Sequence, residues 1–391
     1  MRVLHVTPYF APAFRYGGPP RSILGLCRAL VDAGVDVEVF TTTANGNEPL
    51  TPAPDGTSYE GVRVRYFPLA WPRRYWRARD LASALGRELP SADLVHVHGL
   101  WNLTNASAVR RARAAGCPYV ISPRGMLQPA AMRRRRALKA VAFWTVERAH
   151  LHGAAMLHAT SSAEARRIAG YGPPVETIAN GVTPAPVSVD DVDRLRSIAR
   201  LAPDDDVVMC LGRLHPIKRL DLLAAAFAIV SRERPRARLV IAGPDEDGYR
   251  RRIEPLFAPV AGSTRWLGPV DAGTAWALCA ASRALVQCSD SESFGMSVAE
   301  ALAAGLPVVV TEGTPWSHVS DLGIGYSVPP EPQAIARALL RILEHPADGC
   351  AMGARARLWA RDTFSWEAIG RSMVGAYQRV LERRPSRSDA G

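Results

Sequence analysis

The chain has 391 residues, of which 48% are hydrophobic and 7% aromatic, and this is enough apolar material for the cores of two domains. Its formal net charge of +11 favours anionic partners such as nucleotides or phospholipid surfaces, whereas no RNA- or DNA-binding motif supports nucleic acid. No stretch approaches the ~20 apolar residues of a membrane span and no signal-peptide pattern is present, so we expect a cytoplasmic protein.

In the first half of the chain, short apolar strands alternate with helical patterns, as in βαβ units around a parallel sheet. A helix is expected over residues 21–33, where an amphipathic pattern is followed by a glycine. Strands are expected over residues 3–7, 35–42, 62–67, 93–98, 119–122, 155–159 and 175–178. Residues 180–186 contain a glycine and two prolines and are predicted to link two domains.

A second series of strands follows, with a helix-length interval between neighbours. These strands are expected over residues 207–211, 238–242, 264–267, 284–287 and 307–311. We therefore predict an α/β protein with one doubly wound domain over residues 1–182 and another over residues 183–365. A helix over residues 366–384 is expected to return to the first domain, and the polar residues 385–391 are expected to be disordered.

The most informative motif lies between Glu292 and Glu300, two carboxylates that bracket a loop leading into a helix. The loop and the first helical turn consist of Phe294, Gly295, Met296 and Ser297. A helix start offers unpaired N–H groups and a positive dipole end, which suit phosphate, and carboxylates accept hydrogen bonds from the hydroxyls of a sugar or ribose. The motif thus indicates a nucleotide-sugar site, although an isolated pair at this spacing would indicate only a solvated acidic loop.

Two basic residues, Arg213 and Lys218, lie in the loop after the strand expected at 207–211. In an open α/β sheet, ligands bind outside the carboxyl ends of the strands, where this loop must lie. A guanidinium and an ammonium there could hold adjacent phosphate oxygens. Lysine occurs in this chain only at Lys139 and Lys218, which suggests that position 218 requires a compact ammonium. The alternative is a solvated basic turn.

In the first half, Gly17 and Gly18 precede a helix and would allow a ligand to approach the backbone closely. Their loop does not match G-x-G-x-x-G, which disfavours a nicotinamide oxidoreductase. His96 and His98 end a strand on one face and could suggest a metal, but nothing nearby completes a ligand set. The six cysteines lack C-x-x-C spacing, so we expect no metal or disulfide framework.

These motifs resemble those of the retaining glycosyltransferases of family 4. The resemblance is carried by residues 292–309, 211–221 and 96–101, and it extends over essentially the whole chain. It implies the GT-B fold, in which two Rossmann-like doubly wound domains face each other across a cleft. It also implies transfer of a hexosyl group from a nucleotide-diphosphate sugar (GDP-mannose or a UDP-sugar) to a glycan or lipid-linked acceptor in polysaccharide or glycoconjugate biosynthesis. The nucleotide-sugar is then a substrate, and neither a cofactor nor a metal is expected.

The resemblance also implies a role for each motif. Arg213 and Lys218 would hold the leaving diphosphate, Glu292 would position the sugar hydroxyls, and Glu300 would bind the ribose. The expected catalytic residues are His98, Arg213, Lys218 and Glu292. The expected donor-binding residues are Gly17, Gly18, Arg213, Lys218, Val270, Glu292, Phe294, Gly295, Met296, Ser297 and Glu300. The expected acceptor residues are Trp101 and Arg124.

Two further segments concern the acceptor. Residues 71–77 mix aromatic rings, which suit sugars, with arginines, which suit phosphate. Residues 132–144 are expected to form one basic helix with an apolar continuation, which favours peripheral docking on the inner face of an anionic membrane. An ordinary surface helix, with a basic face in solvent and an apolar stripe buried against the domain, would give the same pattern. The alternatives that stay open are a GT-B nucleotide-sugar epimerase, transfer to a soluble small-molecule glycoside, and a non-catalytic nucleotide-sugar sensor.

Overall fold

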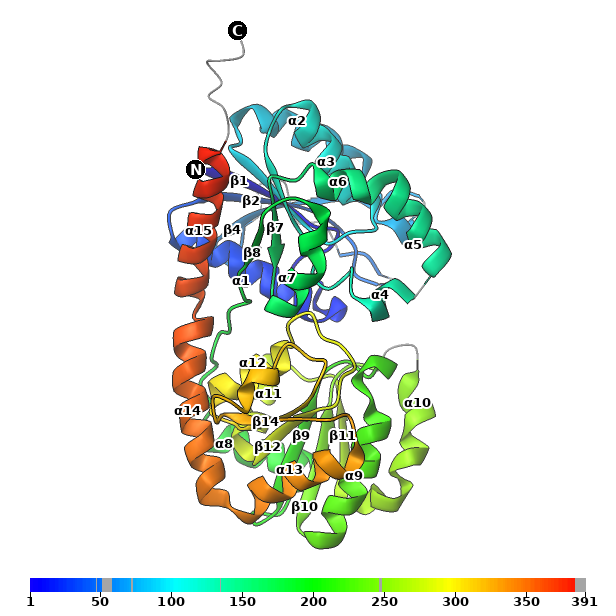
Figure 1. Cartoon of the computed structure of the whole chain (residues 1–391), viewed down its shortest axis with the longest axis vertical. Coiled ribbons are helices and arrows are strands. Elements are labelled where there is room, and N and C mark those ends of the chain that lie inside the picture. Colours follow the sequence, from blue (N-terminus) through cyan, green and yellow to red (C-terminus); the bar gives the residue numbers. More distant parts are fainter. Residues whose placement is uncertain (47, 51–57, 72, 134, 246–247, 384–391) are drawn as a thin grey trace. The chain divides into compact units, whose positions relative to one another are not determined.

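The computed structural model describes residues 1–383 apart from 47, 51–57, 72, 134, 246 and 247. The tail expected at 385–391 therefore lies outside the described residues. The chain divides into two compact units, one made of Met1–Gly181 with the segment that begins at Trp366, and one made of Val182–Ser365 (Figure 1). The helix expected over 366–384 is α15 (Trp366–Glu382), and it belongs to the first unit.

Eight strands form the sheet of the first unit: β1 (Arg2–Val6), β2 (Asp36–Thr42), β3 (Ser58–Tyr59), β4 (Val62–Phe67), β5 (Leu94–His98), β6 (Tyr119–Ser122), β7 (Met156–Ala159) and β8 (Val175–Thr177). Their order is β3-β4-β2-β1-β5-β6-β7-β8, and only the β3–β4 pair is antiparallel. Each strand expected from the sequence forms, with ends that shift by at most one residue, whereas the edge strand β3 was not predicted. In this register His5 on β1 lies beside His96 on β5.

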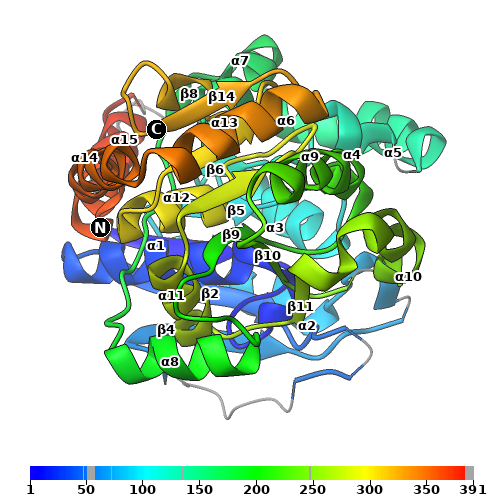
Figure 2. The ribbon, with the colours of Figure 1, turned by 90° about the horizontal axis from the view of Figure 1, so that it is seen from below.

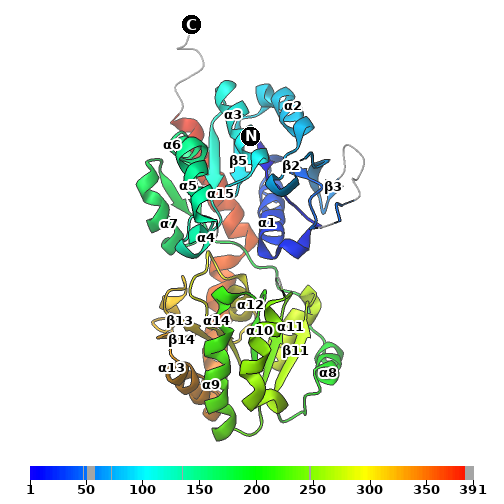
Figure 3. The ribbon, with the colours of Figure 1, turned by 90° about the vertical axis from the view of Figure 1, so that its right-hand side faces the viewer.

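Helices cover both faces of the first sheet. They are α1 (Gly18–Asp32), α2 (Arg79–Glu88), α3 (Leu103–Ala114), α4 (Pro129–Arg133), α5 (Arg136–Ala142), α6 (Arg148–His152), α7 (Ser162–Ile168) and α15. On one face Leu30 of α1 and Tyr377 of α15 pack with Val3, and on the other Leu85 of α2 packs with Leu4. This alternation along β1 is the two-residue period of a strand. Helices α1 and α15 lie side by side (Figure 3).

The single helix expected over residues 132–144 is wrong. Helix α4 ends at Arg133, Arg135 has a left-handed backbone (φ 56°), and α5 begins at Arg136. Arg134 lies outside the described residues. A π-helical turn over Phe143–Glu147 follows and leads into α6. A left-handed residue cannot continue a right-handed helix, so Arg135 separates two short helices in place of the single one expected.

The second unit contains a six-stranded parallel sheet in the order β11-β10-β9-β12-β13-β14. The strands are β9 (Asp206–Leu211), β10 (Ala237–Ala242), β11 (Thr264–Gly268), β12 (Ala284–Gln287), β13 (Val308–Thr311) and β14 (Gly325–Val328), of which β14 was not predicted. The α-helices are α8 (Val189–Ile198), α9 (Leu220–Glu233), α10 (Tyr249–Ile253), α11 (Ala272–Ala281), α12 (Met296–Ala304), α13 (Pro332–Glu344) and α14 (Pro346–Phe364). Figure 2 shows α9 and α13 on one side of this sheet and α8 and α11 on the other.

Candidate functional site

The start of α12 lies where the motif predicted it. The helix begins at Met296, and Gly295 precedes it with a left-handed backbone (φ 88°). A side chain at position 295 would meet the indole of Trp316, because an added Cβ would lie 2.7 Å from Trp316 Nε1. Phe294 is buried against Trp316, with 5.4 Å between the ring centroids. A tight turn at Gly295 therefore leads into the helix, and the first N–H groups of a helix lack partners in the preceding turn of the same helix.

Lys218 and Glu292, which were singled out in two separate motifs, form an ion pair. Lys218 Nζ lies 2.6 Å from Glu292 Oε1, and the side chains are only 18% and 14% exposed. Two neutral donors reach the same oxygen: Gln287 Nε2 at 2.6 Å and Ser289 Oγ at 2.7 Å. Three donors thus converge on one carboxylate oxygen, which holds the carboxylate in a defined position.

Gln287, the last residue of β12, was not predicted as a site residue. Its Oε1 accepts a hydrogen bond from Ser297 Oγ at 2.9 Å, while its Nε2 donates to Glu292. The same amide therefore contacts both the acidic loop and the first turn of α12. In the sequence the only signal is a polar residue at the end of the apolar strand Ala284–Gln287.

The loop that carries Lys218 is packed tightly against its neighbours. A Cβ added at Gly243 would lie 1.9 Å from the carbonyl oxygen of Gly212, so the two loops approach at backbone distance. Arg219 donates to Asp290 Oδ1 at 3.0 Å and to Asp221, and so ties this loop to the residues before Glu292. The Arg213 side chain is exposed in the same loop. The structure places Arg213 and Lys218 after the carboxyl end of β9, as expected.

Two other expected donor residues lie on neighbouring elements of the same unit. Val270 is half-buried between β11 and α11, just before Asp271, which caps α11 by accepting from Thr274 N at 2.7 Å. Glu300 is half-buried on α12. Burial, together with the negative charge of Glu300, raises the pKa of the Cys279 thiol on α11 to about 12. Glu300 thus lies on α12 three residues after Ser297, close enough to Cys279 of α11 to act on its thiol.

In the first unit, His98 belongs to a cluster of buried histidines. His98 Nε2 lies 2.9 Å from His5 Nδ1, and His96 contacts Ser122 Oγ at 2.6 Å. His158 contacts the same hydroxyl at 2.6 Å. Burial lowers the pKa of His5 and of His158 to about 3, and the pKa values of His96 and His98 lie well below the usual value. These rings are therefore neutral near pH 7.

His98 is only 2% exposed, and one expectation about its neighbours is wrong. Nothing was expected to complete a metal ligand set, but His5, His96 and His98 present ring nitrogens within 4.8 Å of one another. A cation is nonetheless disfavoured, because the guanidinium of Arg124 lies 3.2 Å from His98 Nδ1 and ring nitrogens of all three histidines already take part in hydrogen bonds.

Arg124 and Trp101, the expected acceptor residues, lie beside this cluster. Arg124 Nη1 donates to Ser22 Oγ and to Asn180 Oδ1, each at 3.1 Å, and burial lowers the pKa of Arg124 to about 10. Trp101 is half-buried, and its backbone N–H donates to Glu147 Oε1 at 2.7 Å. The expected glycine loop leads into the helix that carries Ser22: Gly17 has φ 85° and caps α1, which begins at Gly18.

One cavity of the first unit lies at the carboxyl ends of its strands. Its volume is about 500 Å³, and its lining residues are Tyr16, Thr43, Asn45, Gly46, Pro49, Pro68, Leu69, Arg73 and Trp76. Tyr16 stacks on Tyr9 with 4.3 Å between centroids, and Tyr9 meets Trp76 edge-on at 6.2 Å. The backbone of Trp76 is left-handed (φ 49°), a strain that is often found at functional sites. Among the lining residues that the structure describes, Arg73 is the only charged one.

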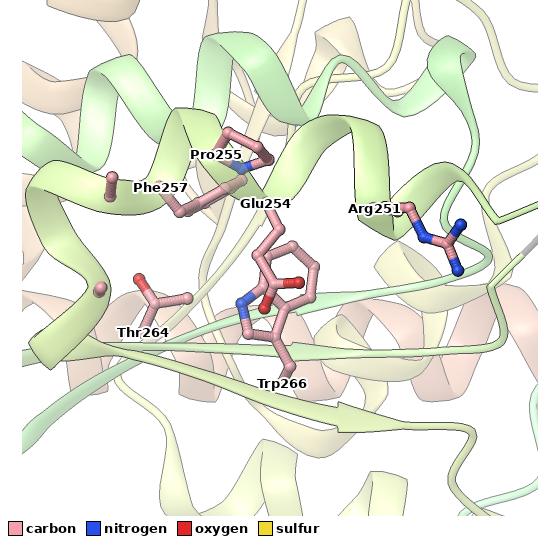
Figure 4. Close-up of a pocket in the computed structure, with 8 residues that line it drawn as sticks. Arg251, Glu254, Pro255, Phe257, Thr264 and Trp266 are labelled. Atoms are coloured by element: carbon pink, nitrogen blue, oxygen red, sulfur yellow. The ribbon is translucent and has the colours of Figure 1, made fainter.

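A second cavity, of about 410 Å³, lies in the second unit. Phe257 and Trp266 meet there edge to face at 5.1 Å, with Arg251 and Glu254 beside them (Figure 4). Its lining includes Thr264, the first residue of β11, whereas Val270 follows the opposite end of that strand. This cavity is therefore separate from the residues expected to bind the donor.

The two halves of the chain match two families. Residues 17–181 match the glycosyl transferase 4-like domain, and residues 191–359 match the glycosyl transferases group 1. A D-inositol 3-phosphate glycosyltransferase of Nocardioides sp. is 30% identical over 418 residues, which cover 96% of this chain and 88% of the relative. The enzyme of the same name from Kineococcus radiotolerans is also 30% identical, over 99% of this chain and 96% of its own length.

Solved structures of low sequence identity share the fold. Sucrose-phosphate synthase from Thermosynechococcus elongatus matches with a TM-score of 0.76 and 21% identity, over 98% of this chain and 100% of the other. HepE of Anabaena, solved in complex with UDP-glucose, matches with a TM-score of 0.74 and 19% identity, over 97% and 100%. Within the described part of the chain, no helix has both the length and the apolar character needed to cross a membrane.

Proposed function

Because this chain belongs to the family 4 glycosyltransferases, which have the GT-B fold, we propose that it transfers a hexosyl group from a nucleoside-diphosphate sugar to a hydroxyl group with retention of configuration. The observation that carries the proposal is the cluster at the start of α12, where Lys218, Glu292 and Ser297 lie on adjoining segments. A cation and a helix start suit the diphosphate, and a carboxylate suits the hydroxyl groups of the sugar.

The donor binds with its diphosphate at Lys218, Arg213 and the N–H groups that open α12. Lys218 then exchanges its contact with Glu292 for a phosphate oxygen, and Glu292 accepts hydrogen bonds from the sugar hydroxyls. Glu300 and the loop at Val270 bind the ribose and the base. His98 is assigned to the transferred sugar by the family resemblance alone, because both of its ring nitrogens have partners in the structure. No cofactor and no metal takes part, since fixed positive charges stabilise the diphosphate.

Transfer proceeds at the anomeric carbon. The bond from this carbon to the diphosphate oxygen breaks and its electron pair stays with the phosphate, while the acceptor oxygen forms the new bond on the same face. The leaving phosphate takes the acceptor proton, so no covalent enzyme intermediate is needed. Stabilisation of the charge on the departing diphosphate by Lys218 and Arg213 is the main catalytic contribution.

The acceptor is a polyol or sugar ring that binds in the 500 Å³ cavity of the first unit. Tyr16 and Trp76 offer aromatic faces for the ring, and Arg73 offers a cation for a phosphate. The relatives named above are called D-inositol 3-phosphate glycosyltransferases, which supports a small phosphorylated polyol as the first acceptor to test. A soluble small molecule is therefore favoured over a polysaccharide.

A lipid-linked acceptor is the second candidate, because one surface of the first unit is both apolar and basic. Leu138, Val141 and Trp144 are 48%, 62% and 66% exposed. Arg136 shares α5 with the first two, and Arg148 lies 4.8 Å from the centre of the Trp144 ring. Exposed apolar side chains beside cations suit the interface of an anionic bilayer, so this surface supports peripheral docking at the inner face of the membrane.

The test is a thermal-shift panel of UDP- and GDP-sugars, followed by incubation of the stabilising donor with and without D-inositol 3-phosphate, inositol and glucose. A ligand raises the melting temperature according to its concentration relative to its dissociation constant. We expect one nucleotide-sugar to stabilise the protein and a glycoside to form with the donor's anomeric configuration. An altered free sugar from the donor alone would establish an epimerase instead. Donor binding without turnover of any acceptor would favour a sensor.

A further inference from the structure

We propose that Gln287 is a positioning residue of the donor site, which holds the Glu292 carboxylate and the first turn of α12 in one arrangement through the two atoms of its amide. The inference rests on the proposed function, since it assumes that Glu292 and α12 bind the donor. It adds a residue that none of the motifs includes.

The hydrogen bonds define the orientation of the Gln287 amide. Nε2 donates to Glu292 Oε1 at 2.6 Å and to Ser289 Oγ at 3.2 Å, while Oε1 accepts from Ser297 Oγ at 2.9 Å. A carboxylate can only accept, so the amide cannot turn by 180° without losing its bond to Glu292. The side chain is only 3% exposed, so water does not compete effectively for these contacts.

The position of Gln287 in the sheet does not explain why it is polar. Gln287 ends the apolar strand β12 and lies opposite Val310 of β13. A buried amide costs free energy unless it is hydrogen-bonded, and a leucine of similar size would fill the space without any partner. All three hydrogen-bond partners of the amide lie in the segment Ser289–Ser297, which contains the expected donor-binding residues.

The three groups that donate hydrogen bonds to Glu292 behave differently when the nucleotide-sugar binds. Lys218 is charged and turns to the diphosphate, whereas Gln287 and Ser289 are neutral and stay. Gln287 therefore keeps the Glu292 carboxylate in place after its ion pair is lost. Because Gln287 also holds Ser297, the carboxylate that receives the sugar and the helix start that receives the phosphate keep a constant spacing.

The first test is the variant Gln287→Leu, which removes both amide contacts. A displacement of about 1 Å at a positioned group can cost on the order of 100-fold in rate, so we expect kcat to fall about 10- to 100-fold with a smaller change in the donor KM. The matched control is Thr264→Val, which removes one buried hydrogen bond at the far end of β11. The Thr264→Val variant should fold, should lose about as much stability as Gln287→Leu, and should keep the wild-type kcat.

The second test is Gln287→Glu, whose outcome depends on pH. A protonated glutamic acid still donates to Glu292 and accepts from Ser297, whereas an ionised one repels the Glu292 carboxylate. Activity of this variant should therefore be restored at low pH and lost as pH rises, relative to wild type. Lys218, 2.6 Å from Glu292 Oε1, faces this pair, and the Cys210 thiol lies close to both residues. The Gln287→Glu profile should therefore be compared at high and low ionic strength.

Wild-type kcat in Gln287→Leu, or a Gln287→Glu profile that parallels wild type, would overturn the positioning role. Lys218→Ala, measured in parallel, separates this failure from a failure of the proposed function. If Lys218→Ala loses donor binding while both Gln287 variants behave as wild type, only the role of Gln287 is wrong. If Lys218→Ala binds the donor normally, the donor site itself is misassigned.

Discussion

Replacement of Lys218 by alanine should weaken binding of the donor diphosphate without unfolding the protein. A hydrogen bond to a charged group contributes ~1.5–3 kcal/mol, and a tenfold change corresponds to about 1.4 kcal/mol, so the affinity should fall about 10- to 150-fold. The loss should lie toward the lower end of this range, because wild-type Lys218 must first leave Glu292, 2.6 Å away. Gln287 and Ser289 continue to hold Glu292 in the variant, so the fold should be retained.

The assay is calorimetric titration of the purified protein with the nucleoside diphosphate that the thermal-shift panel selects and with the matching nucleoside. Lys218→Ala should lose affinity for the diphosphate and keep its affinity for the nucleoside. The control Arg232→Ala removes an exposed positive charge from α9 of the same unit and should bind both ligands as wild type does. Equal diphosphate affinity in Lys218→Ala and wild type would refute the assignment.

Lys218→Arg tests the shape of the site separately from its charge. A Cβ at Gly212 would lie 3.3 Å from Lys218 Cε and Nζ, so the lysine runs close to the backbone of its own loop. A planar guanidinium is bulkier than an ammonium, and the arginine variant should bind the diphosphate less well than wild type although the charge is unchanged. Full activity of Lys218→Arg would show that the site accepts any cation.

Three further predictions concern metal dependence, pH dependence and membrane docking. Activity should persist in excess chelator, because Lys218, Arg213 and a helix start neutralise the diphosphate; a complete loss that magnesium reverses would contradict this. The free energy of unfolding should fall as pH drops from about 6.5 toward 3, by up to about 1.4 kcal/mol per pH unit for each buried histidine, because the unfolded chain gains protons that the folded cluster excludes; a melting temperature that is constant over this range would refute it. Trp144→Ser combined with Val141→Ser should reduce sedimentation with anionic liposomes, and equal sedimentation of variant and wild type would exclude this surface as the docking site.

Most of the fold could be predicted because parallel strands are buried on both faces and appear as continuous apolar runs. The two strands that were missed lack this signal: β3 has only two residues, and β14 reads Gly-Tyr-Ser-Val with three half-buried residues. The expected fold of two α/β domains with parallel sheets is confirmed, and so is membership of the glycosyltransferases. The helix expected over 132–144 failed at Arg135, because composition does not reveal a left-handed residue.

The site could be predicted only in part. Glu292 and Lys218 stand in recognisable motifs, but 74 positions separate them and their contact depends on how two loops meet. His5 and Gln287 escaped notice for a related reason. His5 looks like an interior strand residue until the register places it beside His96, and Gln287 looks like an ordinary strand end. The roles of the site residues stay predictions until the variants are measured.

Helix α15, the last helix in the described part of the chain, affects the order in which the two units can fold during synthesis. Tyr377 of α15 is fully buried in the first unit, and its hydroxyl lies 2.5 Å from His96 Nδ1, although 281 positions separate the two residues. A nascent chain that has emerged through Gly181 therefore contains every described strand of the first sheet but lacks α15, which together with α1 covers one face of it. The first unit can be completed only after the whole second unit has been synthesised. During translation the second unit, which is continuous in sequence, can thus reach its final structure before the unit that precedes it.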